Sequence, residues 1–461
     1  MNKALLLLCL AGLGAACEPL PYSPNRSTEA PPPKMAFVHL VVASSPAQAV
    51  ELHISHQVRA VVEKRGVSPR IELVAGDYPL ELIGGGRTLH ETGLHLLPGT
   101  ETLLVAYAQP SADDSGPLQQ LSAYPLGQRD AKTARVRLLH AAIDAPPLAL
   151  LAPTLSELVD GVASVAMSAY GTLPARLEPG ASLHLRSPYE KAPLIDLSVP
   201  AGLAVGSATT LLGIGEIAPL SAPSDGFGVL SFDEESGALS ELALSPSAQA
   251  SDGQILLFHA SRDLAAVTPR SAGTALHPAI AYQRASTLAA LPAGKRSLSL
   301  DEAAGPVWKG PLNLWPGRGW LLLLYGRRSA PKLVALPRPE QAPQTVWRVA
   351  NLVDGLSSVD LLDGDDALVS GLSYGQASRP ALVDALRPKT LRLRDRGMAN
   401  RSWDIVVTSG SAAAALDQVV TVVLTGSASV PASVSAQLLI ESRAGLSTAA
   451  PVLSLPTSPT L

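Results

Sequence analysis

Short segments in which apolar and polar residues alternate recur four times along the chain. Each contains two leucines, two positions apart, around one more polar residue: Leu80/Leu82, Leu183/Leu185, Leu298/Leu300 and Leu391/Leu393. Because successive side chains of a β-strand point to opposite faces, this period of two predicts a strand with one buried face in each copy. In the first three copies Gly76, Gly180 or Gly294 precedes the strand and supplies a turn residue that tolerates positive φ.

Two further segments accompany each alternating strand. An apolar opening strand lies upstream, at 37–43, 135–141, 254–260 and 346–352, and a turn rich in Ser, Asp and Pro follows it. An almost uninterrupted apolar run lies downstream, at 102–108, 208–215, 320–326 and 419–426. Because the three landmarks recur in the same order at intervals of roughly 100 residues, they predict tandem β-sandwiches of immunoglobulin-like size.

The predicted fold class is therefore all-β, with four tandem immunoglobulin-like β-sandwich domains. The domains are expected at 36–128, 134–246, 253–340 and 345–445, and a flexible tail is expected at 446–461. The joins between them are short and polar, so each domain is expected to have a core of its own with small interfaces between neighbours. A short helix is expected at one place, from Thr154 to Val165.

The N-terminus has the pattern of an export signal. Lys3 precedes an apolar run, Ala4 to Leu13, which is too short to cross a bilayer as a finished helix. Residues 1–16 are predicted to be a signal peptide cleaved after Ala16, and Cys17 is predicted to be the lipidated N-terminus of the mature protein. An ordinary secretory signal is the alternative, because Gly14 stands where a lipoprotein signal usually has a large aliphatic residue.

The residues after the cysteine fit a lipid-anchored envelope protein. Residues 17–35 are polar and rich in proline, as expected of a tether behind a lipid anchor, and the lipid on Cys17 makes the membrane the first predicted partner. Glu18 stands where an aspartate tends to retain a lipoprotein at the inner membrane. The predicted location is therefore the outer membrane, on its periplasmic side or at the cell surface.

Composition and charge exclude some classes of function. Of the 461 residues 47% are hydrophobic and 16% are charged, and the net charge of −4 argues against a nucleic-acid partner. The two cysteines, Cys9 and Cys17, both lie at the N-terminus, so the body of the protein has no disulfide and no thiolate metal site. Stability must then come from burial of apolar side chains.

Two of the opening turns resemble the signature of a known family. His140-Ala-Ala-Ile-Asp144-Ala-Pro146 and His259-Ala-Ser-Arg-Asp263 are similar to the H-A-S-P-D-A-P motif of the extracellular domain of unknown function 4397 family. The pairs Tyr170-Gly171 and Tyr374-Gly375 are also similar to an element of that family, and in the fourth copy Asn351 replaces the histidine. The resemblance covers four degenerate copies and implies a surface or secreted protein with no assigned activity.

The candidate chemistry is weak. His140 and His259 lack a second histidine or cysteine partner in sequence, so we expect these histidines to bond backbone groups at the turn, and we expect no metal and no cofactor. Ser373 matches a nucleophile-elbow pattern, but Ala281 replaces it in the third copy, which favours a structural turn. The segment from Asp363 to Asp366 contains Asp-Gly between two apolar runs, which favours a hairpin over a calcium loop.

The leading expectation is a non-enzymatic lipoprotein that binds or spaces other components of the cell envelope, with an unknown envelope protein or glycan as partner. The alternative is a small-ligand or glycan-binding module that serves an envelope enzyme or transporter, and a hydrolase is the third. A glycan module needs exposed aromatic side chains. The position of Trp308, Trp315, Trp320 and Tyr325, which crowd into the third copy, separates the first two hypotheses.

Overall fold

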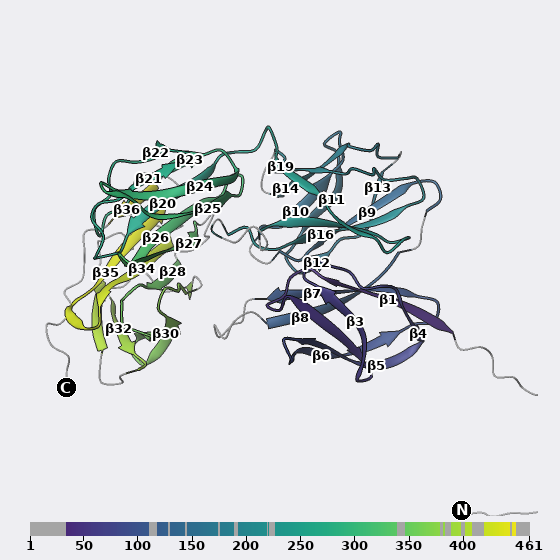
Figure 1. Cartoon of the computed structure of the whole chain (residues 1–461), viewed down its shortest axis with the longest axis horizontal. Helices are drawn as coiled ribbons and strands as arrows, with labels where there is room; N and C mark the ends of the chain where they lie inside the picture. Colours follow the sequence, from purple (N-terminus) through teal and green to yellow (C-terminus); the bar gives the residue numbers. More distant parts are fainter. Residues whose placement is uncertain are drawn as a thin grey trace, which may run out of the picture.

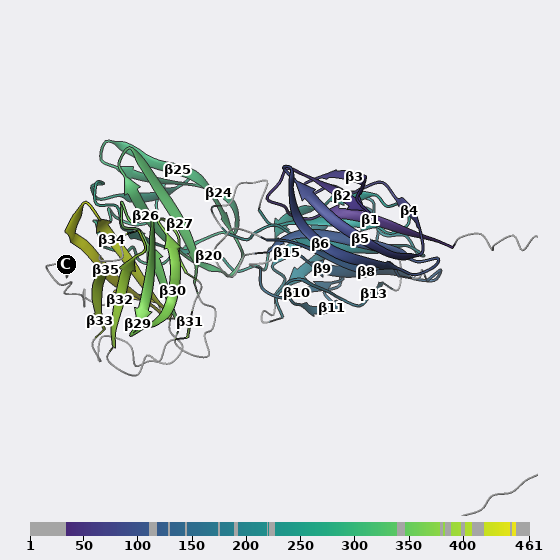
Figure 2. The same cartoon turned by 90° about the horizontal axis from the view of Figure 1, so that it is seen from below.

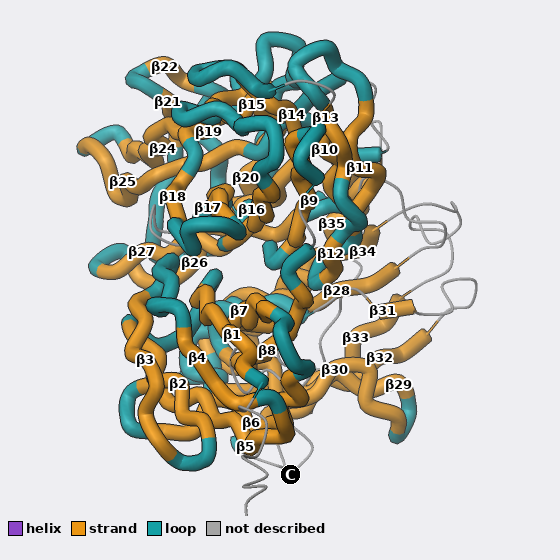
Figure 3. Tube along the Cα trace, turned by 90° about the vertical axis from the view of Figure 1, so that its right-hand side faces the viewer, coloured by secondary structure: helices purple, strands orange, loops and turns teal. Residues whose placement is uncertain are grey.

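The computed structural model describes residues 34–109, 118–127, 130–142, 145–173, 176–188, 192–218, 220, 226–338, 346–378, 381–382, 389–397, 402–407, 419–442 and 445–448. Within these ranges the chain forms strands joined by turns and loops, and none of it is helical (Figure 3). The all-β prediction is confirmed. The predicted signal peptide and almost the whole tether lie outside the described residues, as does the predicted tail after Thr448.

The strands fall into four consecutive groups, which we number as repeats 1 to 4. Repeat 1 contains β1 (Met35–Val42), β2 (Ala49–Ile54), β3 (Gln57–Glu63), β4 (Ile71–Val74), β5 (Gly76–Gly84), β6 (Arg87–Leu96), β7 (Glu101–Gln109) and β8 (Leu118–Pro125). Repeat 2 contains β9 (Ala134–His140), β10 (Leu148–Leu151), β11 (Glu157–Val162), β12 (Ala166–Met167), β13 (Gly171–Leu173), β14 (Ser182–Arg186), β15 (Ile195–Ser198), β16 (Ala208–Ile214), β17 (Gly228–Asp233), β18 (Leu239–Glu241) and β19 (Ala243–Pro246).

The second half of the chain continues the series. Repeat 3 contains β20 (Gly253–His259), β21 (Thr268–Ser271), β22 (Thr274–Ala275), β23 (Ala289–Leu291), β24 (Gly294–Glu302), β25 (Gly305–Leu314), β26 (Gly319–Arg327) and β27 (Ala330–Pro337). Repeat 4 contains β28 (Val346–Asn351), β29 (Ser358–Asp363), β30 (Asp366–Ser373), β31 (Ala381–Leu382), β32 (Lys389–Asp395), β33 (Ser402–Val407), β34 (Val419–Ser427), β35 (Val430–Ser442) and β36 (Gly445–Thr448). The strand β36 reaches into the segment predicted as a tail.

Each repeat folds into two sheets with the same topology. In one, which we call the pairing sheet, the opening strand runs parallel to the late apolar strand: β1 with β7, β9 with β16, β20 with β26 and β28 with β34. The pairing sheets have the orders β4-β1-β7-β8, β12-β9-β16-β17-β18, β23-β20-β26-β27 and β31-β28-β34-β35-β36. The antiparallel outer sheets have the orders β3-β2-β5-β6, β11-β10-β14-β15-β19, β22-β21-β24-β25 and β30-β29-β32-β33. The two sheets stack as a sandwich.

The predicted leucine pairs form the inner face of the outer sheets. All eight leucines are buried, on β5, β14, β24 and β32, whereas the residue between each pair is at least partly exposed. Burying one such leucine contributes about 1.5–3 kcal/mol, so the pairs are a main source of stability. Gly180 and Gly294 have φ of 78° and 101°, which confirms the predicted turn geometry at these two positions.

Two local predictions have opposite outcomes. The hairpin at Asp363 and Asp366 is confirmed, since these residues face each other across the turn between β29 and β30. The short helix expected from Thr154 to Val165 is wrong, because this segment contains β11, which pairs antiparallel with β10. Pairing to a neighbouring strand overrides the weak helical preference of the segment.

The repeats associate in two pairs, repeats 1 and 2 and repeats 3 and 4. Figures 1 and 2 show them as two lobes, one coloured purple to teal and the other green to yellow. Within a lobe the pairing sheets face each other. One buried apolar cluster joins β1 and β7 to β9, β16 and β17, and a second joins β20, β26 and β27 to β28, β34 and β35. Repeats 1 and 4 each also have an apolar cluster of their own between their two sheets. The apolar clusters shared within each lobe differ from the small interfaces that we expected.

The pairing sheets are therefore buried on both faces. In β26, Leu322 and Leu324 belong to an apolar cluster that runs through repeats 2 and 3, whereas Leu321, Leu323 and Tyr325 belong to the cluster shared with repeat 4. In β7 the corresponding side chains divide in the same way between the core of repeat 1 and the cluster shared with repeat 2. A strand that is buried on both faces has a continuous run of apolar residues in its sequence. This explains the almost uninterrupted apolar run near the end of each copy.

Candidate functional site

The histidines of the opening turns lie at the ends of β9 and β20. The Nε2 atom of His140 is 2.9 Å from the carbonyl oxygen of Pro146, and that of His259 is 2.8 Å from the carbonyl oxygen of Ala265. Since a carbonyl oxygen accepts, Nε2 of each imidazole carries the proton and donates it. Each histidine therefore fastens the turn that follows its strand, six residues on.

Asn351 occupies the same place in repeat 4 and acts in a similar way. Its Nδ2 atom donates to the carbonyl oxygen of Leu372 at 3.1 Å, and its Oδ1 atom accepts from the backbone N–H of Val353 at 3.4 Å. All three side chains are fully buried. The shared element is thus a buried donor that holds the backbone at the end of the opening strand.

Burial also determines the protonation of the two histidines. It lowers the pKa of both His140 and His259 below the ordinary value of 6.5, because the charged imidazolium would be desolvated. Both side chains are neutral at pH 7. The described residues contain no group of three or more His, Cys, Asp or Glu side chains that could hold a metal ion.

Of the two aspartates of the motif, only Asp263 lies in the part of the chain that the structure describes. Asp144 lies outside the described residues, and Asp263 is exposed on the turn after β20. Burial raises the pKa of Tyr374 to about 12, and the negative charge of Asp263 adds a small part of this rise. Among the described residues, the Nε2 atom of His259 donates to the carbonyl oxygen of Ala265 and not to Asp263.

Repeats 2 to 4 each have a tyrosine downstream of the opening turn, and each of these tyrosines contacts the neighbouring repeat of its lobe or the segment that leads to it. The Tyr170 hydroxyl accepts from the N–H of Gly127, in the join between repeats 1 and 2, at 2.9 Å. The Tyr282 hydroxyl is 3.4 Å from Thr425 Oγ1 of repeat 4, and the Tyr374 ring packs edge to face on Tyr325 of repeat 3 with centroids 5.5 Å apart. This landmark therefore serves contacts between repeats.

A buried polar network lies where repeat 2 meets repeat 1. Arg137 on β9 donates from Nε to Thr210 Oγ1 on β16 at 2.8 Å, and Thr210 donates to Glu234 Oε1 at 2.6 Å. The Arg137 and Glu234 side chains are 3.2 Å apart and both are buried. Arg137 also donates from a terminal nitrogen to the carbonyl oxygen of Pro125, the last residue of β8 in repeat 1, at 3.0 Å.

Repeat 4 contains the same network. Arg348 on β28 donates from Nε to Thr421 Oγ1 at 2.7 Å and forms an ion pair with Glu441 at 2.5 Å. A terminal nitrogen of Arg348 donates to the carbonyl oxygen of Pro337 at 2.6 Å, and Pro337 is the last residue of β27 in repeat 3. Arg338 Nε lies 3.6 Å from the other oxygen of Glu441.

The odd-numbered repeats lack the network. By strand register, the arginine and threonine positions are taken by His39 and Leu103 in repeat 1 and by Leu256 and Leu321 in repeat 3. The network and its proline partner thus recur every second repeat. The sequence does carry a signal for this network, because the second and fourth copies have an arginine, Arg137 or Arg348, inside an otherwise apolar opening strand.

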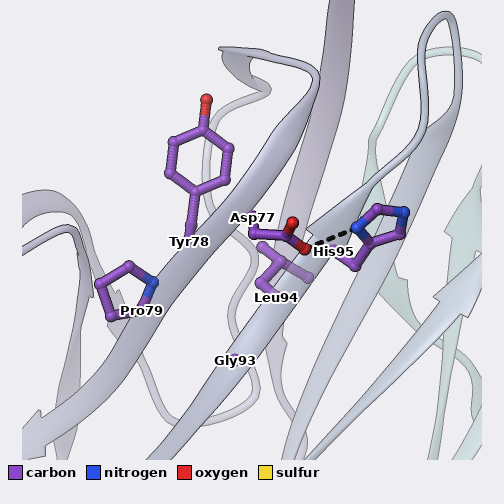
Figure 4. Close-up of a pocket in the computed structure, with 6 residues that line it drawn as sticks. All are labelled: Asp77, Tyr78, Pro79, Gly93, Leu94 and His95. Carbon is purple, nitrogen blue, oxygen red and sulfur yellow. Dashed lines mark hydrogen bonds and ion pairs between the residues drawn. The ribbon is translucent and has the colours of Figure 1, made fainter.

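The hairpin of β5 and β6 carries a surface hollow of about 490 Å³ with a single ion pair. Figure 4 shows Asp77 and His95 directed toward each other, and their Oδ1 and Nδ1 atoms are 2.6 Å apart. Tyr78 donates from its hydroxyl to the carbonyl oxygen of Val74. Because both members of the pair are largely exposed, the pair contributes about 0–1 kcal/mol and no chemistry.

The aromatic residues of repeat 3 are mostly inside the protein. Trp315, Trp320 and Tyr325 are buried, and Trp308 on β25 is partly buried against the core. Ser373 lies at the end of β30, before a turn, and no helix follows it in the described residues, so the strand-to-helix context of a nucleophile elbow is missing there.

No helix among the described residues is long and apolar enough to span a bilayer. No protein-family model and no curated protein matches this chain. The resemblance to the domain of unknown function 4397 family stays a prediction based on the motifs quoted above.

Proposed function

We propose that this chain is a non-enzymatic lipoprotein of the bacterial cell envelope, in which a lipid on Cys17 tethers a stiff array of four sandwiches. The array spaces or presents binding surfaces away from the outer membrane. The N-terminal apolar run, the cysteine after Ala16 and the proline-rich segment behind it support the anchor.

The observation that carries the proposal is the pairing of repeats through both apolar and polar contacts. The shared clusters contain fully buried leucines, and buried arginines reach across both joins to the carbonyl oxygens of Pro125 and Pro337. A flexible string of domains would have small, polar joins. The chain thus uses its buried charges to fix one repeat on the next, as a spacer requires.

The glycan-binding alternative is less well supported. Such a module would present aromatic rings to solvent, whereas Trp320 and Tyr325 are buried in repeat 3. An envelope protein recognised through the sandwich surfaces remains the proposed type of partner.

Two experiments test the two parts of the proposal. The first is membrane fractionation of Cys17→Ser in a Gram-negative host. The variant is expected in the soluble fraction and the wild type in the outer-membrane fraction, with acyl groups on Cys17 by mass spectrometry. A variant that stays membrane-bound, or a wild type without acyl groups, contradicts the anchor.

The second experiment measures stiffness in a soluble form that begins at residue 18, which contains no cysteine. Val58→Cys and Val205→Cys place spin labels on repeats 1 and 2, at positions that are 55% and 47% exposed. Pulsed electron resonance is expected to give one narrow distance distribution between the labels. A broad distribution contradicts a stiff pair and leaves the lipid anchor unaffected.

A further inference from the structure

A cavity of about 500 Å³ lies between the two lobes, where repeat 2 meets repeat 3. Its walls come from β15, β18 and β19 of repeat 2 and from β24 and β25 of repeat 3, together with the loop residues next to them. This volume is within the roughly 300–1,000 Å³ typical of small-molecule pockets, which often lie at domain interfaces. The neutral histidines, the buried networks and the predicted lipid anchor lie outside it.

The floor of the cavity is apolar and aromatic. Ile195, Leu242 and Trp315 line it and are buried in the protein. The Phe227 ring of repeat 2 meets the Trp315 ring of repeat 3 edge to face, with centroids 4.7 Å apart and planes at 85°. Aromatic edges and aliphatic side chains of this kind suit a flat or extended apolar body.

The rim of the cavity is polar, with one carboxylate, Glu241, and one ammonium, Lys295. Glu241 is neutralised by Arg65 of repeat 1, because its Oε1 atom lies 2.8 Å from a terminal nitrogen of Arg65. Lys295 is exposed, lines the cavity and has no ion-pair partner among the described residues. Asn313, directly opposite Lys295 in the register of β24 and β25, adds an amide that can donate.

From these contacts we infer that the cavity binds a small amphipathic anion. Its apolar body lies on Trp315 and Phe227, and its anionic group, a carboxylate, sulfonate or phosphate, meets the Lys295 ammonium and the Asn313 amide. Since both repeats contribute to floor and rim, the ligand would bridge the two lobes. This inference goes beyond the spacer role and does not depend on the lipid anchor.

The test uses the soluble form from residue 18 and the fluorescent anion 1-anilinonaphthalene-8-sulfonate. We expect saturable binding at one site, with competition by decanoate and at least tenfold weaker competition by the uncharged decanol. Lys295→Gln is expected to weaken binding of the probe by about tenfold or more, since hydrogen bonds to charged groups are worth roughly 1.5–3 kcal/mol. Lys309→Gln, an exposed lysine on β25 outside the cavity, is the matched control and should leave binding unchanged.

A second variant tests the position of the site independently of charge. Ser245 lies exposed at the rim, so Ser245→Trp fills the mouth without disturbing the core and should abolish binding of the probe, while circular dichroism remains that of the wild type. The inference is overturned if Lys295→Gln and Lys309→Gln bind alike, if decanol competes as well as decanoate, or if Ser245→Trp still binds the probe.

Discussion

Replacing Arg348 by leucine removes the cation from the network that joins repeats 3 and 4. The Arg348 side chain is 3% exposed and that of Glu441 is 0% exposed, so the variant leaves a carboxylate buried without its main partner. Removing one partner of a buried pair typically costs about 3–5 kcal/mol. We expect a loss near the lower value, because the Thr421 hydroxyl and the more distant Arg338 still face Glu441.

The loss is measured by urea unfolding of the soluble form, followed by circular dichroism, and is located by hydrogen exchange of β28 and β34. Adding Glu441→Gln to Arg348→Leu should recover most of the stability, since the amide keeps an acceptor for Thr421 and no buried anion remains. Repeat 3 carries Leu256 at the same position, which indicates that the fold accepts an apolar residue there.

The control is Arg392→Leu, which removes an ion pair with Asp404 on the outer sheet of the same repeat. Arg392 is 55% exposed and Asp404 47%, so this change should cost less than about 1 kcal/mol. The reasoning is refuted if Arg348→Leu costs no more than Arg392→Leu, or if Arg348→Leu/Glu441→Gln is no more stable than Arg348→Leu alone.

Two further predictions concern pH and the pairing of repeats. Because the native pKa values of His140 and His259 are lowered below 6.5, the unfolded chain binds more protons as pH falls below 6.5; the unfolding free energy should therefore be lower at pH 5 than at pH 7.5. His140→Asn and His259→Asn, which copy the natural Asn351, should reduce this pH dependence in urea titrations, and an unchanged dependence would contradict the assignment. Leu298→Ala removes a fully buried side chain from the apolar cluster that runs through repeats 2 and 3, and it should cost about 2–5 kcal/mol. Hydrogen exchange should become faster in repeats 2 and 4 as well as in repeat 3, because both pack on repeat 3. Exchange that accelerates in repeat 3 alone would show that this repeat unfolds independently of its neighbours.

The sequence was sufficient for features that depend on local periodicity. The leucine pairs alternate with polar residues on one strand each, so their inward direction followed from the spacing alone. The turn at Gly364 likewise followed from Asp-Gly between two apolar runs. Both features are determined within a few residues and needed no knowledge of distant contacts.

Contacts between repeats were not predicted, for a physical reason. The runs at 320–326 and 419–426 have no alternation, which is the pattern of a strand buried on both faces, but the pattern does not say what covers the second face. The roles of Arg137 and Arg348 depend on Glu234 and Glu441, which lie about 100 residues away in sequence. Only the fold brings these groups together, and the same is true of the cavity at Trp315.

The mutual burial of the pairing sheets limits how such a chain can change its length in evolution. Each pairing sheet covers the equivalent sheet of its neighbour, as in an isologous dimer. The outward apolar faces of the two pairing sheets in a lobe are therefore buried against each other within one polypeptide. A gene that lost or gained a single repeat would encode a protein with one such face open to solvent, with leucines and a tyrosine at its centre. Duplication of a whole pair of repeats would avoid exposing such a face. It would also place the arginine network in every second repeat, which is where this chain has it.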